Sequence, residues 1–157
     1  MTRRRQNRAK AGQRCLGCHG AELAAGCGSS RPRRAACIVA PVTYYLALCA
    51  YDGGPWRPLA VYGRSIVVGF VMEAVDPGDG SYWIGGVVID STSQDRGYGR
   101  ATMEAMIARA RSASCPSVGL SYHPDNSAAR RLHASLGFIE TGEVNGDEGV
   151  SRLSLRT

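Results

Sequence analysis

Two glycines and two arginines are concentrated in one short run of the sequence, Gln94-Asp95-Arg96-Gly97-Tyr98-Gly99-Arg100-Ala101. An apolar run ends just before it and helical periodicity begins within it, so we expect it to join a strand to the N-terminus of a helix. The unpaired N–H groups and positive dipole end of such a terminus bind phosphate oxygens. Gly97 and Gly99 would allow close approach, and Arg96 and Arg100 add charge. On these glycines alone, an ordinary strand-to-helix turn is the better interpretation.

Two common nucleotide-binding motifs are missing from this region. The third glycine of a Rossmann fingerprint is absent, and the sequence contains no G-x-x-x-x-G-K-[ST] run. We therefore do not expect a dinucleotide site or a P-loop.

Carboxylates could bind a cationic amine or relay its proton at six positions, which are Glu73, Asp90, Glu140, Glu143, Asp147 and Glu148. Any one of them is more often a solvated charge at a strand end. Asp90 is the preferred candidate for substrate binding, because it ends the strand that leads into the Gln94 run.

Cysteine and histidine give a weaker signal near the start of the chain. The run Cys15-Leu16-Gly17-Cys18-His19 fits the C-x-x-C-H motif of haem attachment, but it has no export signal or haem pocket around it. Together with Cys27 and Cys37 the spacing matches no familiar zinc site. We expect no metal site.

The first half of the chain contains the signals of one helix and three strands. An apolar segment after Pro41 predicts a helix over about 42–50, which the turn at 52–55 ends. The β-branched runs 58–63 and 66–73 predict a hairpin, and 82–90 predicts a third antiparallel strand. The period then becomes helical over about 99–112, with a buried face formed by Met103, Met106, Ile107 and Ala110.

The second half predicts a strand, a helix and a final pair of strands. The strand covers 117–122, and the helix covers 127–136 with Asn126 as N-cap and Gly137 as its end. Ala128, Leu132 and Leu136 form the expected core stripe of this helix. Strands over 138–144 and 150–155 complete an α/β fold with one mixed sheet covered by helices.

Two motifs in this order resemble a known family. Gln94–Gly99 matches the Q/R-x-x-G-x-G/A pyrophosphate loop of the GNAT superfamily of acetyl-CoA-dependent N-acetyltransferases. The run from Asn126 to Phe138 resembles the second signature of that family, N-x-x-A-x-x-L-Y-x-x-x-G-F. The resemblance covers about residues 41–155. It implies an acyl-CoA N-acyltransferase fold, acetyl-CoA as co-substrate, and direct attack of an amine on the thioester.

The C-terminal half is also similar to the bacterial spermine/spermidine (polyamine) acetyltransferases. The shared stretches are Y-x-P-x-N, from Tyr122, and F-x-E-T-G-E-x-x-x-x-E, from Phe138. The hairpin runs PWRPLAVY and VGFVM are similar as well. This implies a small primary amine such as spermidine as the acceptor.

The resemblance also implies site residues. The backbone at Val88 and Ile89 would pair with the pantetheine arm, Gln94 and the amides of 96–101 would hold the pyrophosphate, and Asn126 would lie beside the pantetheine. The tyrosine that acts in the family as general acid toward the coenzyme sulfur corresponds here to His133, which can also donate a proton near neutral pH. Asn126 and His133 are two helical turns apart, so both can face the cofactor. The alternative is that His133 is a polar helix-surface residue and water protonates the thiolate.

The positive charge of the protein is concentrated at its N-terminus. The net charge is +6, but residues 1–41 hold nine basic side chains and one acidic one, whereas the remainder holds ten basic and twelve acidic. Residues 1–36 have no regular periodicity, so we expect an irregular, basic, cysteine-rich tail followed by an N-acetyltransferase domain over 37–157. The usual first strand and helix of the superfamily would then be missing, and the open edge near 59–62 could support a homodimer.

The remaining expectations concern location and partners. No apolar run approaches a membrane span, and the basic start is not followed by a secretory h-region, so we expect a cytoplasmic protein with no membrane partner. The expected partner is a small-molecule amine, and we do not expect nucleic acid. Two rival hypotheses are a catalytically silent acyl-CoA-binding module and a nucleic-acid-associated protein that uses its basic tail.

Overall fold

The computed structural model describes residues 39–156. The predictions for the tail over residues 1–36 and for Cys15, Cys18, Cys27 and Cys37 lie outside the described residues. None of the helices within 39–156 is long and apolar enough to cross a membrane.

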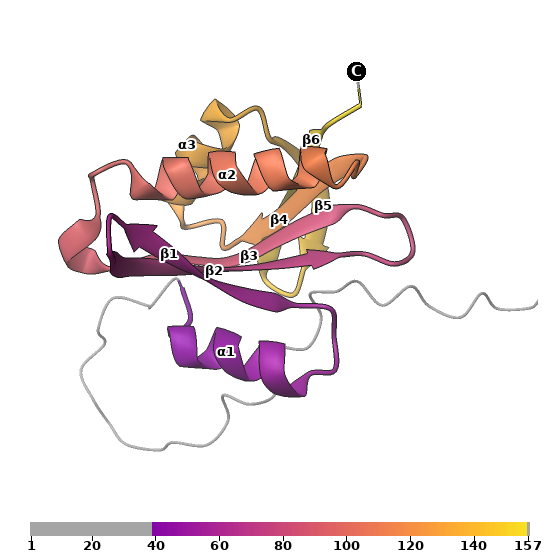
Figure 1. The fold of residues 1–157 in the computed structure, drawn as a ribbon. Coiled ribbons are helices and arrows are strands. Elements are labelled where there is room, and N and C mark those ends of the chain that lie inside the picture. The colour runs from indigo at the N-terminus through magenta and orange to yellow at the C-terminus, as the bar shows by residue number, and fades with distance from the viewer. Residues whose placement is uncertain (1–38, 157) are drawn as a thin grey trace, which may run out of the picture.

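Six strands form one mixed sheet in the order β1-β2-β3-β4-β6-β5, with helices on both faces. The helix α1 covers one face, and α2 and α3 lie on the other (Figure 1). The elements in chain order are α1 Val42–Tyr51, β1 Arg57–Gly63, β2 Ile66–Val75, β3 Tyr82–Ile89, the short 3-10 helix η1 Ser91–Ser93, α2 Tyr98–Ser112, β4 Ser117–Tyr122, α3 Ser127–Ser135, β5 Ile139–Asn145 and β6 Glu148–Ser154. The predicted α/β fold and the order of its elements are confirmed.

The main core lies between α2, α3 and the sheet. The predicted face of α2 is buried, and it meets apolar side chains of the central strands such as Ile84, Val118 and Leu120. The predicted stripe of α3 needs a correction. Ala128 is exposed, and the side chains that face inward are Ala129, Leu132, His133 and Leu136.

The last hairpin is tighter than predicted. Asn145 pairs with Glu148 across the turn at Gly146 and Asp147, so β6 begins two residues earlier than the sequence suggested. This start places Glu148 in the sheet rather than in a loop.

A bulge in β3 shapes the centre of the sheet. Val88 pairs with Phe70 of β2 and Gly85 with Met72, so two residues of β3, Gly86 and Val87, lie opposite one residue of β2. Gly86 has φ 56°, which a side chain rarely tolerates, and a Cβ there would lie 2.9 Å from the ring of Tyr45 on α1. Bulges of this kind bend the strand that contains them.

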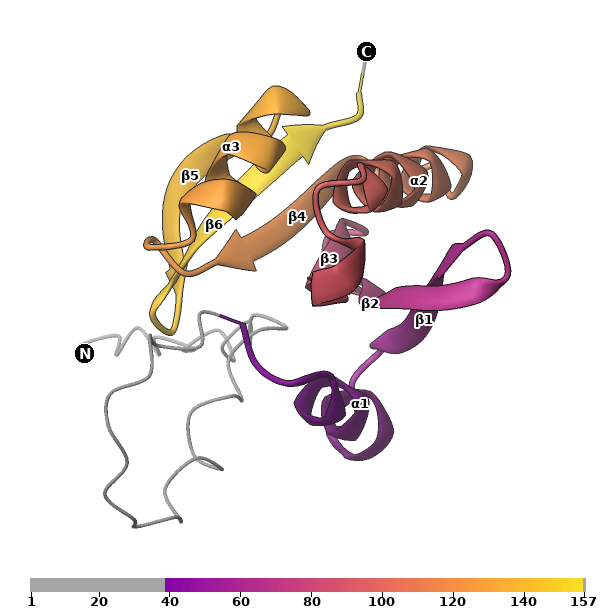
Figure 2. The same ribbon diagram turned by 90° about the vertical axis from the view of Figure 1, so that its left-hand side faces the viewer.

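The bend accompanies a separation of the two central parallel strands. β3 and β4 pair at only two positions, Tyr82 with Val118 and Trp83 with Gly119. Beyond them β4 continues beside β6 to Tyr122, and Figure 2 shows β3 and β4 diverging. Their facing backbone edges are therefore not joined to each other after Trp83.

Candidate active site

The free edge of β3 offers hydrogen-bonding groups at the point of separation. The Asp90 amide donates to the Val68 carbonyl at 2.8 Å, so the backbone of this residue faces β2. Because backbone groups alternate along a regular strand, those of Val88 also face β2, whereas those of Ile89 face the separated side. The predicted pantetheine contact of Val88 is therefore directed the wrong way, and that of Ile89 is compatible with the structure.

Asp90 has a local structural role. Its carboxylate accepts hydrogen bonds from the amide of Thr92, at 3.0 Å, and from the hydroxyl of the same residue, and so caps η1. The adjoining Gln94 donates from Nε2 to the Ile89 carbonyl at 3.0 Å, which ties the loop to the end of β3. These contacts favour a loop-positioning role for both residues over the predicted substrate contact of Asp90 and cofactor contact of Gln94.

The N-terminus of α2 follows directly and has free amides. Gly97 is the N-cap with φ 82°, and a Cβ on it would have no atom within 4 Å. The first helical hydrogen bond runs from the Ala101 amide to the Gly97 carbonyl at 3.0 Å. The Ala101 amide is thus already used, and the amides of Tyr98, Gly99 and Arg100 have no intrahelical acceptor. The loop and helix dipole together fit an anionic group.

In this segment Tyr98 and Arg100 contact neighbouring elements, whereas Arg96 is exposed. The Tyr98 ring packs on the β1–β2 hairpin, since a Cβ on Gly63 would lie 2.6 Å from its hydroxyl oxygen. Arg100 reaches α3, where its Nη2 donates to Ser135 Oγ at 2.5 Å. Arg96 is exposed and forms no ion pair with any described residue. Arg96 is therefore the arginine best placed to meet a phosphate.

The α3 helix brings Asn126 and His133 to the same region. Asn126 caps the helix as predicted, because its Oδ1 accepts from the Ala129 amide at 3.1 Å. His133 is only 8% exposed, and its ring centroid lies 5.1 Å from that of Tyr122 and 5.9 Å from that of Phe138. The alternative of a polar residue on the helix surface is therefore wrong.

Burial determines the charge state of His133. Its Nδ1 is buried without a hydrogen-bond partner, and desolvation lowers the pKa of the imidazole to about 4. At pH 7 about one molecule in a thousand would then carry the imidazolium. A role as general acid in the charged form is disfavoured, whereas a neutral N–H remains available as a hydrogen-bond donor.

Three of the candidate carboxylates are neutralised by arginine. Glu73 is 1% exposed and binds both Arg109, at 2.6 and 2.8 Å, and Arg57, at 2.6 Å. Burial alone would raise the pKa of Glu73, but hydrogen bonds from Arg109 and Tyr82 outweigh burial and lower it. Two further pairs are Arg130 with Glu140, at 2.7 Å, and Arg152 with Glu143, at 3.6 Å. These carboxylates are held by structural ion pairs.

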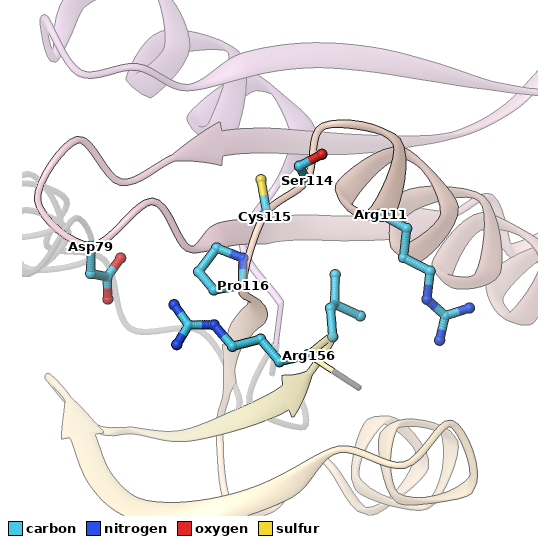
Figure 3. Close-up of a pocket in the computed structure, with 7 residues that line it drawn as sticks. Asp79, Arg111, Ser114, Cys115, Pro116 and Arg156 are labelled. Atoms are coloured by element: carbon cyan, nitrogen blue, oxygen red, sulfur yellow. The ribbon is translucent and has the colours of Figure 1, made fainter.

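A pocket of about 440 Å³ lies at the other end of α2 (Figure 3). It is lined by residues that follow this helix, including Cys115 and Pro116, together with Arg111 and Arg156. The two guanidinium groups point in opposite directions in Figure 3. A helix C-terminus is the negative end of the dipole, so the N-terminus is the better site for a phosphate.

The separated central strands and the adjoining helix N-terminus define an acyl-CoA N-acyltransferase. Residues 14–138 match the family described as the Acetyltransferase (GNAT) family. The chain belongs to this family. It is an acyltransferase.

Solved structures share this fold. Similar structures include yncA of Salmonella typhimurium with acetyl-CoA, at 22% identity and TM-score 0.55 over 74% of this chain and 72% of that one. The ribosomal-protein-S18-alanine N-acetyltransferase of Escherichia coli matches at 19% identity and TM-score 0.59, over 71% and 77%. A Bacillus subtilis acetyltransferase in complex with CoA matches at 12% and 0.58, over 71% and 84%. A search of proteins with curated functions gives no match.

The bulge in β3 beside the strand separation is not among the features predicted from the sequence. Gly85 and Gly86 occur as a pair inside the third predicted strand, and glycine inside a strand pattern is a signal for a bulge. Both positions leave little room for a side chain. A Cβ on Gly85 would lie 3.2 Å from the ring of Trp56, and a Cβ on Gly86 would lie 2.9 Å from the ring of Tyr45.

Proposed function

We propose that this enzyme transfers the acetyl group of acetyl-CoA to a primary amine of a small cationic molecule, such as spermidine. The observation that carries the proposal is the separation of β3 from β4 beside the free N-terminus of α2. The similarity of the C-terminal half to polyamine acetyltransferases supports the choice of acceptor.

Residues present at the separation suit acetyl-CoA. The amides of Tyr98, Gly99 and Arg100 and the free guanidinium of Arg96 would hold the pyrophosphate, and open space beside Gly97 leaves room for it. The backbone of Ile89 would pair with the pantetheine arm, and the N-cap Asn126 would lie beside it. When bound, the coenzyme supplies an acetyl group activated as a thioester.

His133 would act on the sulfur as a neutral hydrogen-bond donor. The unpartnered Nδ1 and the lowered pKa support an uncharged ring, which stabilises a departing thiolate by donating an N–H rather than by giving up a proton. The thiolate would then take its proton from the attacking amine or from water. A tyrosine at this position should retain or raise turnover, since it too donates a hydrogen bond.

We further propose that the enzyme works in the cytoplasm, where the free thiols of Cys49 and Cys115 would remain reduced. The expected homodimer stays a prediction, which light scattering on the purified chain would test.

An acetylation assay tests the proposal. The purified chain is incubated with acetyl-CoA and a panel of spermidine, 1,4-diaminobutane, glucosamine and a lysine-containing peptide, and free thiol and acetylated product are both measured. Acetylation of at least one cationic small amine is the expected result. Binding of acetyl-CoA without any acetylated product would identify the silent binding module instead.

A further inference from the structure

Two aromatic rings mark the point of strand separation on the α1 face of the sheet. The ring of Tyr45 lies over Gly86 of β3, where a Cβ would come within 2.9 Å of it. The indole of Trp83 lies over Gly119 of β4, where a Cβ would come within 3.0 Å. Trp83 alternates with Tyr82 and Ile84, which belong to the core against α2, so its ring lies on the opposite face of the sheet. On that face the guanidinium carbon of Arg152 lies 5.0 Å from the centroid of the Trp83 ring.

The next residue of β4 on this face holds a carboxylate of β6 through a hydrogen bond. Ser121 follows Gly119 by two positions, so the two residues share a face of the sheet. The Ser121 hydroxyl donates to Glu148 Oε2 at 2.5 Å. Glu148 is half-buried at the start of β6.

A tyrosine of α1 lies within electrostatic range of this carboxylate. Burial raises the pKa of Tyr44, and the negative charges of Asp52 and Glu148 raise it further. The hydroxyl therefore stays protonated and can donate a hydrogen bond. The Tyr44 ring also meets that of Tyr45 edge to face at 5.6 Å, which links it to the aromatic surface at the strand separation.

Glu148 differs from the other described glutamates in its ion-pair partners. Each of the other four glutamates within residues 39–156 has an arginine within 4.0 Å, namely Glu73, Glu104, Glu140 and Glu143. Within the same residues Glu148 has no cation at that distance. A half-buried carboxylate gains most from a cation that reaches it. Among residues 39–156, the partner that this carboxylate lacks is therefore a positive charge.

We propose that Glu148, held in place by Ser121, binds the ammonium group of the acceptor and selects amines that have no carboxylate beside the amino group. The inference rests on the proposed function, because it assumes that an acceptor amine enters from the α1 side. The Tyr44 hydroxyl oxygen would accept a second hydrogen bond from the ammonium, and the Tyr45 ring would cover the carbon chain of the acceptor. Glu148 thus acts as the specificity-determining residue of the acceptor site.

The test compares two glutamates of the same hairpin. Glu148→Gln removes the free charge, whereas Glu143→Gln removes a charge that Arg152 already neutralises. Initial rates are measured with spermidine, 1,4-diaminobutane and alanine at saturating acetyl-CoA. Glu148→Gln should raise the KM for the wild type's preferred diamine or triamine about 10- to 100-fold, since charge-assisted hydrogen bonds have that strength. The KM for acetyl-CoA should not change, and Glu143→Gln should stay within about twofold of wild type for both substrates.

Each outcome decides the inference. Wild-type acetylation with an unchanged amine KM in Glu148→Gln, or a wild-type preference for alanine, would overturn it and leave the acetyltransferase function standing. A wild-type chain that acetylates no amine would overturn the proposed function as well. Should Glu148→Gln fail to fold by circular dichroism, Ser121→Ala replaces it, and this variant should raise the amine KM several-fold without changing the KM for acetyl-CoA.

Discussion

Replacing His133 with leucine should stabilise the protein. The wild-type imidazole is 8% exposed and leaves Nδ1 buried without a partner, which costs about 1–3 kcal/mol. Leucine has no polar atom and can occupy the space between Tyr122 and Phe138. We expect the free energy of unfolding at pH 7 to rise by about 1 kcal/mol, because part of the gain is lost to imperfect packing.

The stability difference should grow as the solution becomes more acidic. The pKa of His133 is about 4 in the folded protein, against 6.5 for an unperturbed histidine. Between these values the unfolded chain binds more protons than the folded one, so the wild type loses stability as pH falls through this window. The full loss is about 3 kcal/mol at about 1.4 kcal/mol per unit, and the leucine variant escapes it.

Urea unfolding followed by tryptophan fluorescence at pH 7, 5.5 and 4.5 measures this difference directly. Protonation of carboxylates destabilises both proteins, so subtracting one curve from the other isolates His133. A wild-type-to-variant difference that is the same at all three pH values would refute the reasoning. So would an NMR titration that places the pKa of His133 near 6.5.

Three further substitutions test other parts of the structure. Gly97→Asp should weaken CoA binding about tenfold in calorimetry, because it places a negative charge beside the pyrophosphate. The control Gly97→Asn tolerates the same backbone conformation without the charge and should bind within a few-fold of wild type. Equal affinities of the two variants would contradict the pyrophosphate assignment. Gly86→Ala should lower the free energy of unfolding by about 1–3 kcal/mol more than Gly142→Ala does. Both glycines have positive φ, but only Gly86 lies against the Tyr45 ring. Equal losses of stability in urea unfolding would show that this contact does not matter. Arg109→Leu should lower the free energy of unfolding by about 2 kcal/mol at pH 7, since it removes a partner of the buried Glu73. This loss should shrink as pH falls through the lowered pKa of the Glu73 carboxyl. A loss that is independent of pH in the same assay would count against the ion pair.

The order of helices and strands was predictable because each has its own local signal. Period-two runs, the helical face around Met103 and the caps at Asn126 and Gly137 all appear in short stretches of sequence and recur in the structure. The loop after β3 was predictable for the same reason, since its glycines must serve a turn at a helix start. Local signals therefore located the fold and the cofactor loop.

The remaining features depend on contacts between distant residues. Whether His133 is exposed depends on Tyr122 and Phe138, and whether a glutamate is free depends on which arginine reaches it across the sheet. No spacing rule reports these pairings, so Asp90 was preferred over Glu148 on sequence grounds. The bulge at Gly86 lies between these cases, because the glycine pair was visible but its effect on β4 was not.

An amide NMR titration with CoA tests the central claim most directly. If the coenzyme binds between the separated strands and at the start of α2, the amides of Ile89, Tyr98, Gly99 and Arg100 should shift in proportion to saturation. The amides of Ser114, Cys115 and Arg156, which line the pocket at the far end of α2, should not shift. Shifts confined to that far pocket, with the loop from Gln94 to Ala101 unchanged, would contradict the account.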